Sequence, residues 1–175
     1  EYTAALSFLA QISESSPYFA QASRLTHQLQ ALDVSSMIEQ IQRASSTDVT
    51  KTVSTIVDAS PSAVIQELLN VCIDTWHHEG DVSLHWLRPA MIALLEYETG
   101  IPPSIRGEAW RLLGDFERAK PLLVEAIQRT GDSIQTTAGL ADCTRDAAAM
   151  QRVIHSTSHN DTTRYWYWLS NVRLL

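Results

Sequence analysis

The densest group of side chains that could do chemistry lies between residues 74 and 85. Asp74 and His78 are four residues apart, so on a helix they share one face and could bind a zinc ion, with His85 as a third ligand from beyond a turn. The spacing is not that of a His-Glu-x-x-His zinc site, and no fourth ligand is evident. The preferred interpretation is therefore an ordinary polar surface turn, and we expect no metal and no cofactor. The complete group is Asp74, His77, His78, Glu79, Asp81 and His85.

Signatures of covalent catalysis are missing from the sequence. There is no Gly-x-Ser-x-Gly, no glycine-rich phosphate loop and no recognised Cys/His spacing, so we expect that the chain is not an enzyme. Cys72 and Cys143 lie far apart without a Cys-x-x-Cys pair, which excludes a cysteine-rich zinc site and leaves one disulfide arithmetically possible. Cys72 falls on an apolar helical stripe and is predicted to be a small core residue.

Composition and charge narrow the classes of partner. The 175 residues are 45% hydrophobic and 19% charged, which is typical of a globular domain. Thirteen Lys and Arg against twenty Asp and Glu give a net charge of −7, the wrong sign for binding nucleic acid or an anionic membrane. No apolar run is long enough to insert into a membrane, and no signal-peptide pattern is present. The chain begins at Glu1 rather than Met, so we expect an excised or processed piece. The compartment is unknown; a cytoplasmic location is favoured, with a removed signal or anchor left open.

Apolar residues recur at three- and four-residue spacing along the whole chain, which predicts an all-α fold. The clearest helix spans 62–78, with Ser60 and Pro61 as start signals, and a second helix follows up to Gly100. Pro89 and Pro121 fall inside predicted helices, where kinks or late starts are expected. The other predicted helices span 3–13, 17–32, 34–44, 48–59, 103–113, a segment carrying Phe116 to Ile127, 133–144, 146–157, and a final stretch from Asn160 or Asp161 to the end.

The sequence also repeats. Gly80-Asp81 and Gly114-Asp115 lie 34 residues apart, as do Trp76 and Trp110. The stretch Leu113-Gly114-Asp115-Phe116-Glu117-Arg118-Ala119, followed by Leu123 and Ala126-Ile127, resembles the turn and second helix of a tetratricopeptide repeat, and Gly107 matches its small first-helix residue. The first unit departs from the pattern with His85 and Pro89, and Arg145-Asp146 replaces the glycine turn in the third. The resemblance is close over about 34 residues and weaker over 66–158.

This resemblance implies a right-handed α-solenoid of antiparallel helix hairpins. Residues 61–175 would form the tetratricopeptide-like repeats with a C-terminal aromatic helix. Residues 1–60 would form N-terminal hairpins of uncertain repeat type, HEAT-like or another solenoid type included, and the two parts are expected to make one continuous domain.

In that family the first helix of each pair lines a concave groove that takes a peptide or a partner's helix. An acidic groove with one Arg favours a cationic segment, and a plain solvated helix face is the alternative. The basic carboxylate clamp of chaperone-binding family members is not supported. The corresponding positions are Glu67, Asn70, Asp74, His77, His78, Ser104, Glu108, Arg111, Gln135 and Asp142.

Four aromatic residues stand together at 165–168. Consecutive positions spread around a helix, so Tyr165, Trp166 and Trp168 are candidate interface residues for self-association, unless further repeats cover them. We therefore predict a non-catalytic protein-interaction or scaffold module. The alternatives are a metal-binding domain using Asp74, His78 and His85, or a structural spacer or self-assembly segment of a larger protein.

Overall fold

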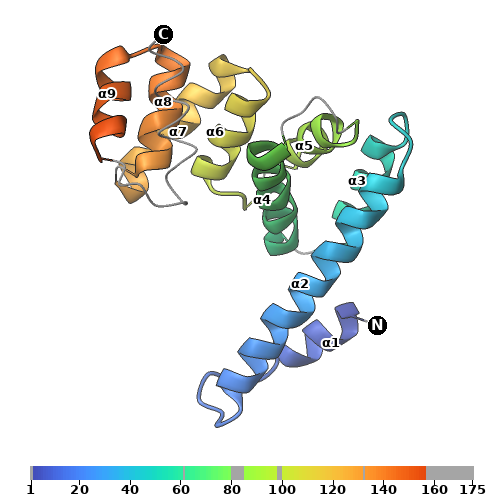
Figure 1. Cartoon of the computed structure of the whole chain (residues 1–175). Coiled ribbons are helices and arrows are strands. Elements are labelled where there is room, and N and C mark those ends of the chain that lie inside the picture. The colour runs from blue at the N-terminus through green and yellow to red at the C-terminus, as the bar shows by residue number, and fades with distance from the viewer. Residues whose placement is uncertain (1, 61, 80–84, 98–99, 132, 157–175) are drawn as a thin grey trace.

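The computed structural model describes residues 2–60, 62–79, 85–97, 100–131 and 133–156. All regular secondary structure within these residues is helical, which confirms the predicted all-α class (Figure 1). The predicted final helix, with Tyr165, Trp166 and Trp168, lies outside the described residues, as does the Gly80-Asp81 turn. The helices are α1 (Tyr2–Leu9), α2 (Phe19–Arg43), α3 (Val49–Asp58), α4 (Ser62–Glu79), α5 (Leu87–Leu95), α6 (Pro103–Leu112), α7 (Phe116–Thr130), α8 (Ile134–Thr144) and α9 (Ala147–Ser156).

Helix α2 corrects one sequence prediction. Two helices were expected, at 17–32 and 34–44, but the structure has a single helix from Phe19 to Arg43 with Asp33 in its interior. This segment contains neither Gly nor Pro, so nothing in its backbone chemistry forces a break. Val34, Ile38 and Ile41 form one buried stripe on the C-terminal half of the helix, and burying that stripe outweighs the weak helix propensity of a single Asp.

The two internal prolines behave differently. Pro89 is the third residue of α5, which begins only at Leu87, as expected for a late start. Pro121 lies well inside α7, and the helix continues on both sides of it. Ser60, a predicted start signal, lies two residues before α4, and its hydroxyl donates to the carbonyl oxygen of Ile56 in α3 at 2.7 Å.

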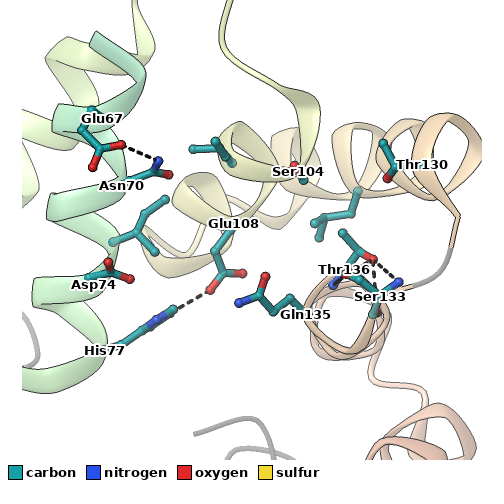
Figure 2. Close-up of a pocket in the computed structure, with 13 residues that line it drawn as sticks. Glu67, Asn70, Asp74, His77, Ser104, Glu108, Thr130, Ser133, Gln135 and Thr136 are labelled. Atoms are coloured by element: carbon teal, nitrogen blue, oxygen red, sulfur yellow. Dashed lines mark hydrogen bonds and ion pairs between the residues drawn. The ribbon is translucent and has the colours of Figure 1, made fainter. Parts of the chain in front are cut away.

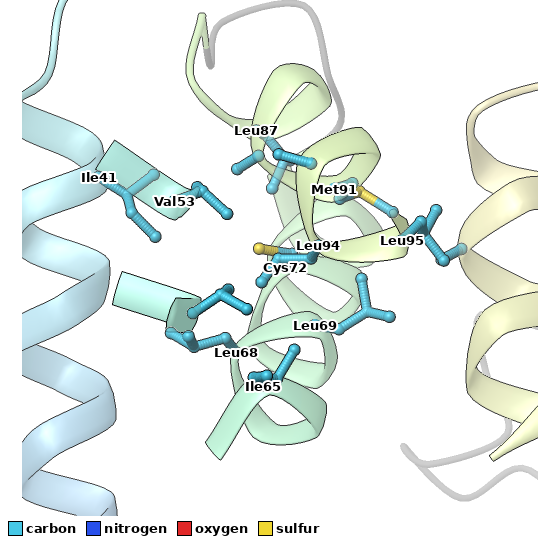
Figure 3. Packing of buried hydrophobic residues seen from close by; sticks show 14 of the residues in the cluster. Ile41, Val53, Ile65, Leu68, Leu69, Cys72, Leu87, Met91, Leu94 and Leu95 are labelled. Carbon is cyan, nitrogen blue, oxygen red and sulfur yellow. The ribbon is translucent and has the colours of Figure 1, made fainter. Parts of the chain in front are cut away.

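The main hydrophobic core joins α2 to α6 in one cluster that runs across residue 60 (Figure 3). Ile41, Leu68 and Leu94 are completely buried within it. Two much smaller clusters hold α8 and α9 together, and they consist largely of alanine with Met150 and Val153. Among the residues that the structure describes, the buried apolar side chains therefore form one large central core and only small clusters between α8 and α9.

Helices α4 to α9 pack in a regular order. Helix α4 contacts α5 and α6, helix α6 contacts α7 and α8, and helix α8 contacts α9. The three helices α4, α6 and α8 are thus successive neighbours, which brings their polar faces together. Gly107 lets α6 pack closely on α7, because a Cβ atom at this position would lie 2.9 Å from Leu123 Cγ on α7.

The turns after α6 and α8 have the same structure. Gly114 has φ +83° and Arg145 has φ 55°, so both adopt the left-handed conformation that ends a helix. The following amides of Asp115 and Asp146 donate to Trp110 and Ala141, five residues earlier. Each aspartate then accepts from the amide three residues later in the next helix. The predicted glycine-aspartate turn therefore recurs 31 residues later although arginine has replaced glycine.

None of the helices in the described part of the chain is both long and apolar enough to cross a membrane.

Candidate functional site

One polar pocket, of about 370 Å³, lies against α4, α6, α7 and α8 (Figure 2). Helix α4 supplies acidic, amide and imidazole groups, and α6 and α8 supply a carboxylate, an amide and hydroxyls. Apolar side chains of three elements complete the wall. The lining residues are Glu67, Asn70, Ile73, Asp74, His77, Ser104, Ile105, Glu108, Leu123, Thr130, Ser133, Gln135 and Thr136.

The structure brings seven of the ten sequence-predicted groove residues together in this pocket: Glu67, Asn70, Asp74, His77, Ser104, Glu108 and Gln135. The other three do not line it. His78 is exposed, and its Nδ1 atom lies 2.7 Å from the backbone oxygen of Asp74. The side chains of Arg111 and Asp142 are only 3% and 4% exposed, so both are buried rather than open to a partner.

Four charged or titratable side chains form a continuous chain of contacts across three helices. His77 Nε2 on α4 lies 2.9 Å from Glu108 Oε1 on α6. Arg111 donates to the same carboxylate through Nη2 at 2.7 Å and through Nε at 2.8 Å. Its Nη1 donates to Asp142 Oδ2 on α8, also at 2.7 Å. We call His77, Glu108, Arg111 and Asp142 the ionic chain; it fixes α4, α6 and α8 to one another.

The ionic chain determines the protonation state of Glu108. Burial by itself would raise the pKa of Glu108, but the charge and hydrogen bonds of Arg111, together with the contact to His77, outweigh burial and lower this pKa below its ordinary value. Glu108 is therefore ionised at neutral pH and is paired with Arg111, the cation that it shares with Asp142. The acidic character of the pocket then comes from Glu67 and Asp74, both exposed on α4. Glu67 also accepts a hydrogen bond from Asn70 Nδ2 at 3.3 Å.

Sequence reasoning missed the pairing inside the ionic chain. It placed Arg111 and Asp142 in the groove because they occupy corresponding positions of successive first helices, 31 residues apart, three residues before the equivalent turns. Opposite charges at corresponding positions of neighbouring helices were the available signal for an ion pair. Whether the pair is buried depends on the packing of α6 against α8, which local periodicity does not report.

The proposed metal ligands are not gathered into a site. His85 Nε2 lies 3.3 Å from the backbone oxygen of Ala44, while His78 contacts its own helix. No group of three acidic, histidine or cysteine side chains that could hold a metal ion occurs among the residues that the structure describes. The structure therefore gives no support to a metal centre built from Asp74, His78 and His85.

Both cysteines are free thiols. Burial raises the pKa of Cys72 to about 12, and Cys72 lies within the main core as predicted. Cys143 is half-buried, and burial is the main reason that its pKa rises to about 11. A thiol with such a high pKa is a poor nucleophile near neutral pH, so neither residue has the properties of an activated cysteine.

Comparison with known proteins adds no family assignment: no protein-family model, no curated protein and no solved structure matches the chain. The all-helical fold is compatible with a helical-repeat protein. The resemblance to tetratricopeptide repeats rests on the sequence itself, chiefly on Gly107 and on the stretch from Leu113 to Ile127.

Proposed function

We propose that this chain is a non-catalytic protein-interaction module, which binds a cationic peptide or helix of a partner in the pocket between α4, α6 and α8. The observation that carries the proposal is the convergence of polar groups from three successive helices on one pocket, at positions chosen from the sequence as groove positions. Plain solvated helix faces would not need to share a cavity. The exposed carboxylates of Glu67 and Asp74 favour a ligand with positive charges.

The proposal includes the arrangement of the helices. The pairs α4/α5, α6/α7 and α8/α9 would be the hairpins of a right-handed, tetratricopeptide-like solenoid. The contacts between successive first helices and the equivalent turns at Gly114 and Arg145 support this arrangement. Such a stack presents a rigid surface, so a partner can be bound with little ordering cost in the receptor.

The test compares the affinity of two matched charge variants for basic peptides. Glu67→Lys with Asp74→Lys reverses the exposed charge of the pocket, and Asp58→Lys with Glu117→Lys makes the same change at exposed positions that do not line it. Glu108 is left intact, because its buried contact with Arg111 belongs to the fold. A library of basic, neutral and acidic peptides is screened by fluorescence anisotropy at physiological salt.

We expect basic peptides to bind the wild type and the Asp58/Glu117 variant equally, and to bind the pocket variant at least tenfold more weakly, which corresponds to about 1.4 kcal/mol. Equal losses in both variants would mean that only the overall charge attracts the peptides. A pocket variant that binds like the wild type would contradict the proposal, as would a library in which nothing binds.

A further inference from the structure

Within the described part of the chain, the exposed large apolar side chains are concentrated at one end. Four of the five that the structure identifies among the described residues are Phe8, Tyr18, Phe19 and Leu25, and the fifth is Ile92 on α5. The first four belong to α1, to the N-terminal part of α2, and to the link between these helices. We call residues 2–26 the N-terminal hairpin.

The hairpin stands apart from the core. The C-terminal half of α2 inserts Val34, Ile38 and Ile41 into the main core, whereas Ala22 is the buried hydrophobic residue of its first turns. Helix α1 packs on α2, and Figure 1 shows this pair projecting away from the body formed by α4 to α9. Among the residues that the structure describes, the apolar side chains of the hairpin therefore have little to pack against.

The charge of the hairpin indicates which partner fits. Residues 2–26 contain Glu14 and Arg24 as their only Asp, Glu, Lys or Arg, so they carry no net charge in a chain of net charge −7. A lipid surface is disfavoured, because peripheral membrane segments combine apolar residues with several Lys or Arg. A strongly charged partner would meet no opposite charge. A second copy of the same neutral hairpin meets neither obstacle, and Glu14 and Arg24 offer it one charge of each sign.

The exposed large apolar side chains would supply about half of the area that a dimer contact needs. Phe8 is 70% and Tyr18 67% exposed, with Phe19 at 38% and Leu25 at 42%. At roughly 200 Å² for a whole large side chain, these four expose about 400 Å², which is half of the roughly 800 Å² that each partner buries in a stable interface. Backbone and small side chains of the hairpin can supply the remainder.

We propose that the N-terminal hairpin is a homodimer contact. Two hairpins related by a two-fold axis pair through these exposed side chains, so that two helices from each copy form a small four-helix bundle. In this arrangement the pockets of the two copies stay open, and one dimer presents two of them.

The test is sedimentation velocity of the full chain from about 1 to about 200 µM, a range in which mass action populates a micromolar dimer. Phe8→Ser with Tyr18→Ser removes the most exposed anchors, and Phe19→Ser with Leu25→Ser is a second, independent variant. Ile92→Ser is the matched control, because Ile92 is as exposed as Phe19 but lies on α5. Circular dichroism checks that every variant keeps the helix content of the wild type.

We expect a reversible dimer in the wild type and in Ile92→Ser, with dimerisation at least tenfold weaker in both hairpin variants. A monomer over the whole range would overturn the proposal, as would a dimer that neither hairpin variant weakens. Co-sedimentation with neutral phosphatidylcholine vesicles tests whether the hairpin binds a lipid surface instead of a second copy. Vesicle binding by a monomeric wild type that Phe8→Ser with Tyr18→Ser abolishes would assign the hairpin to lipid instead.

Discussion

Replacing Arg111 by Met tests the ionic chain most directly. The change removes a side chain that is 3% exposed and takes the shared cation away from the buried Asp142 and from Glu108, whose side chain is 12% exposed. Methionine keeps most of the length of the side chain, so the loss is mainly electrostatic. Removing one partner of a buried ion pair costs about 3–5 kcal/mol, and we expect about 3 kcal/mol here because Glu108 keeps its contact with His77.

The cost of Arg111→Met depends on pH in a defined direction. In the wild type the pKa of Glu108 is lowered, so its contribution to stability is present above its ordinary pKa and is lost only as pH falls through the lowered value. Without Arg111, burial is the largest remaining influence and raises this pKa, so the ionised form destabilises the variant at neutral pH. Protonation relieves that penalty as pH falls. The gap in unfolding free energy between wild type and variant should therefore narrow on acidification.

Urea denaturation of both proteins at about pH 7.5 and about pH 4.5 measures this gap. Arg118→Met is the matched control, because Arg118 is 64% exposed and pairs with Asp115 at the surface; it should cost less than about 1 kcal/mol at either pH. Adding Glu108→Gln to Arg111→Met should restore part of the loss at neutral pH. A loss below about 1 kcal/mol in Arg111→Met, or a gap that is constant with pH, would refute the argument.

Three further predictions concern the fold. Gly107→Ala should lower the free energy of unfolding by about 1–3 kcal/mol, since the added Cβ would lie 2.9 Å from Leu123 Cγ. The control is Gly139→Ala, which should be neutral or stabilising because its nearest contact would be at 3.4 Å. Equal shifts of the two variants in thermal denaturation would contradict this prediction. Arg145→Gly should stabilise the protein by about 1 kcal/mol in the same assay, because a positive φ of 55° costs free energy for arginine and not for glycine. A loss of stability would mean that contacts of the arginine side chain contribute more than the relief of backbone strain. Amide hydrogen exchange should be faster in α8 and α9 than in α4 and α5, because the described residues of α8 and α9 form only small apolar clusters. Equal protection would show that the chain opens as one unit.

The helices between residues 60 and 156 could be predicted because their ends carry local chemical signals. Pro103 begins α6, and Gly114 and Gly131 end α6 and α7 with positive φ. These features act within a few residues, so they are visible in sequence. The continuity of α2 could not be predicted from sequence, because an Asp between two apolar segments resembles a helix break unless the packing of the second segment is known.

The pocket was predictable for a related reason. The tetratricopeptide-like register assigns each first helix one groove-facing side, and that resemblance selected Glu67, Asp74 and Glu108 together. Helical spacing alone places Asp74 on one face of its helix with Asn70 and His78. Periodicity does not report depth below the surface. Arg111 and Asp142 share the register of the groove, but the packing of α6 on α8 buries them against each other. The exposed aromatic side chains of the N-terminal hairpin were likewise invisible, since an apolar helix looks the same in sequence whether or not another element covers it.

The Arg111–Asp142 pair also bears on how such a protein can change by gain or loss of hairpins. Repeat proteins commonly lengthen or shorten by duplication or deletion of whole units, since each unit contacts only its neighbours. A hairpin inserted between α7 and α8 would separate Arg111 from Asp142, whose Nη1 and Oδ2 atoms now lie 2.7 Å apart, and would break this buried ion pair. Arg111 would keep its contact with Glu108, which lies on the same helix. To replace the lost ion pair, the first helix of a new unit would have to offer a basic side chain to Asp142. Variation in the number of hairpins should therefore arise at other junctions of the chain.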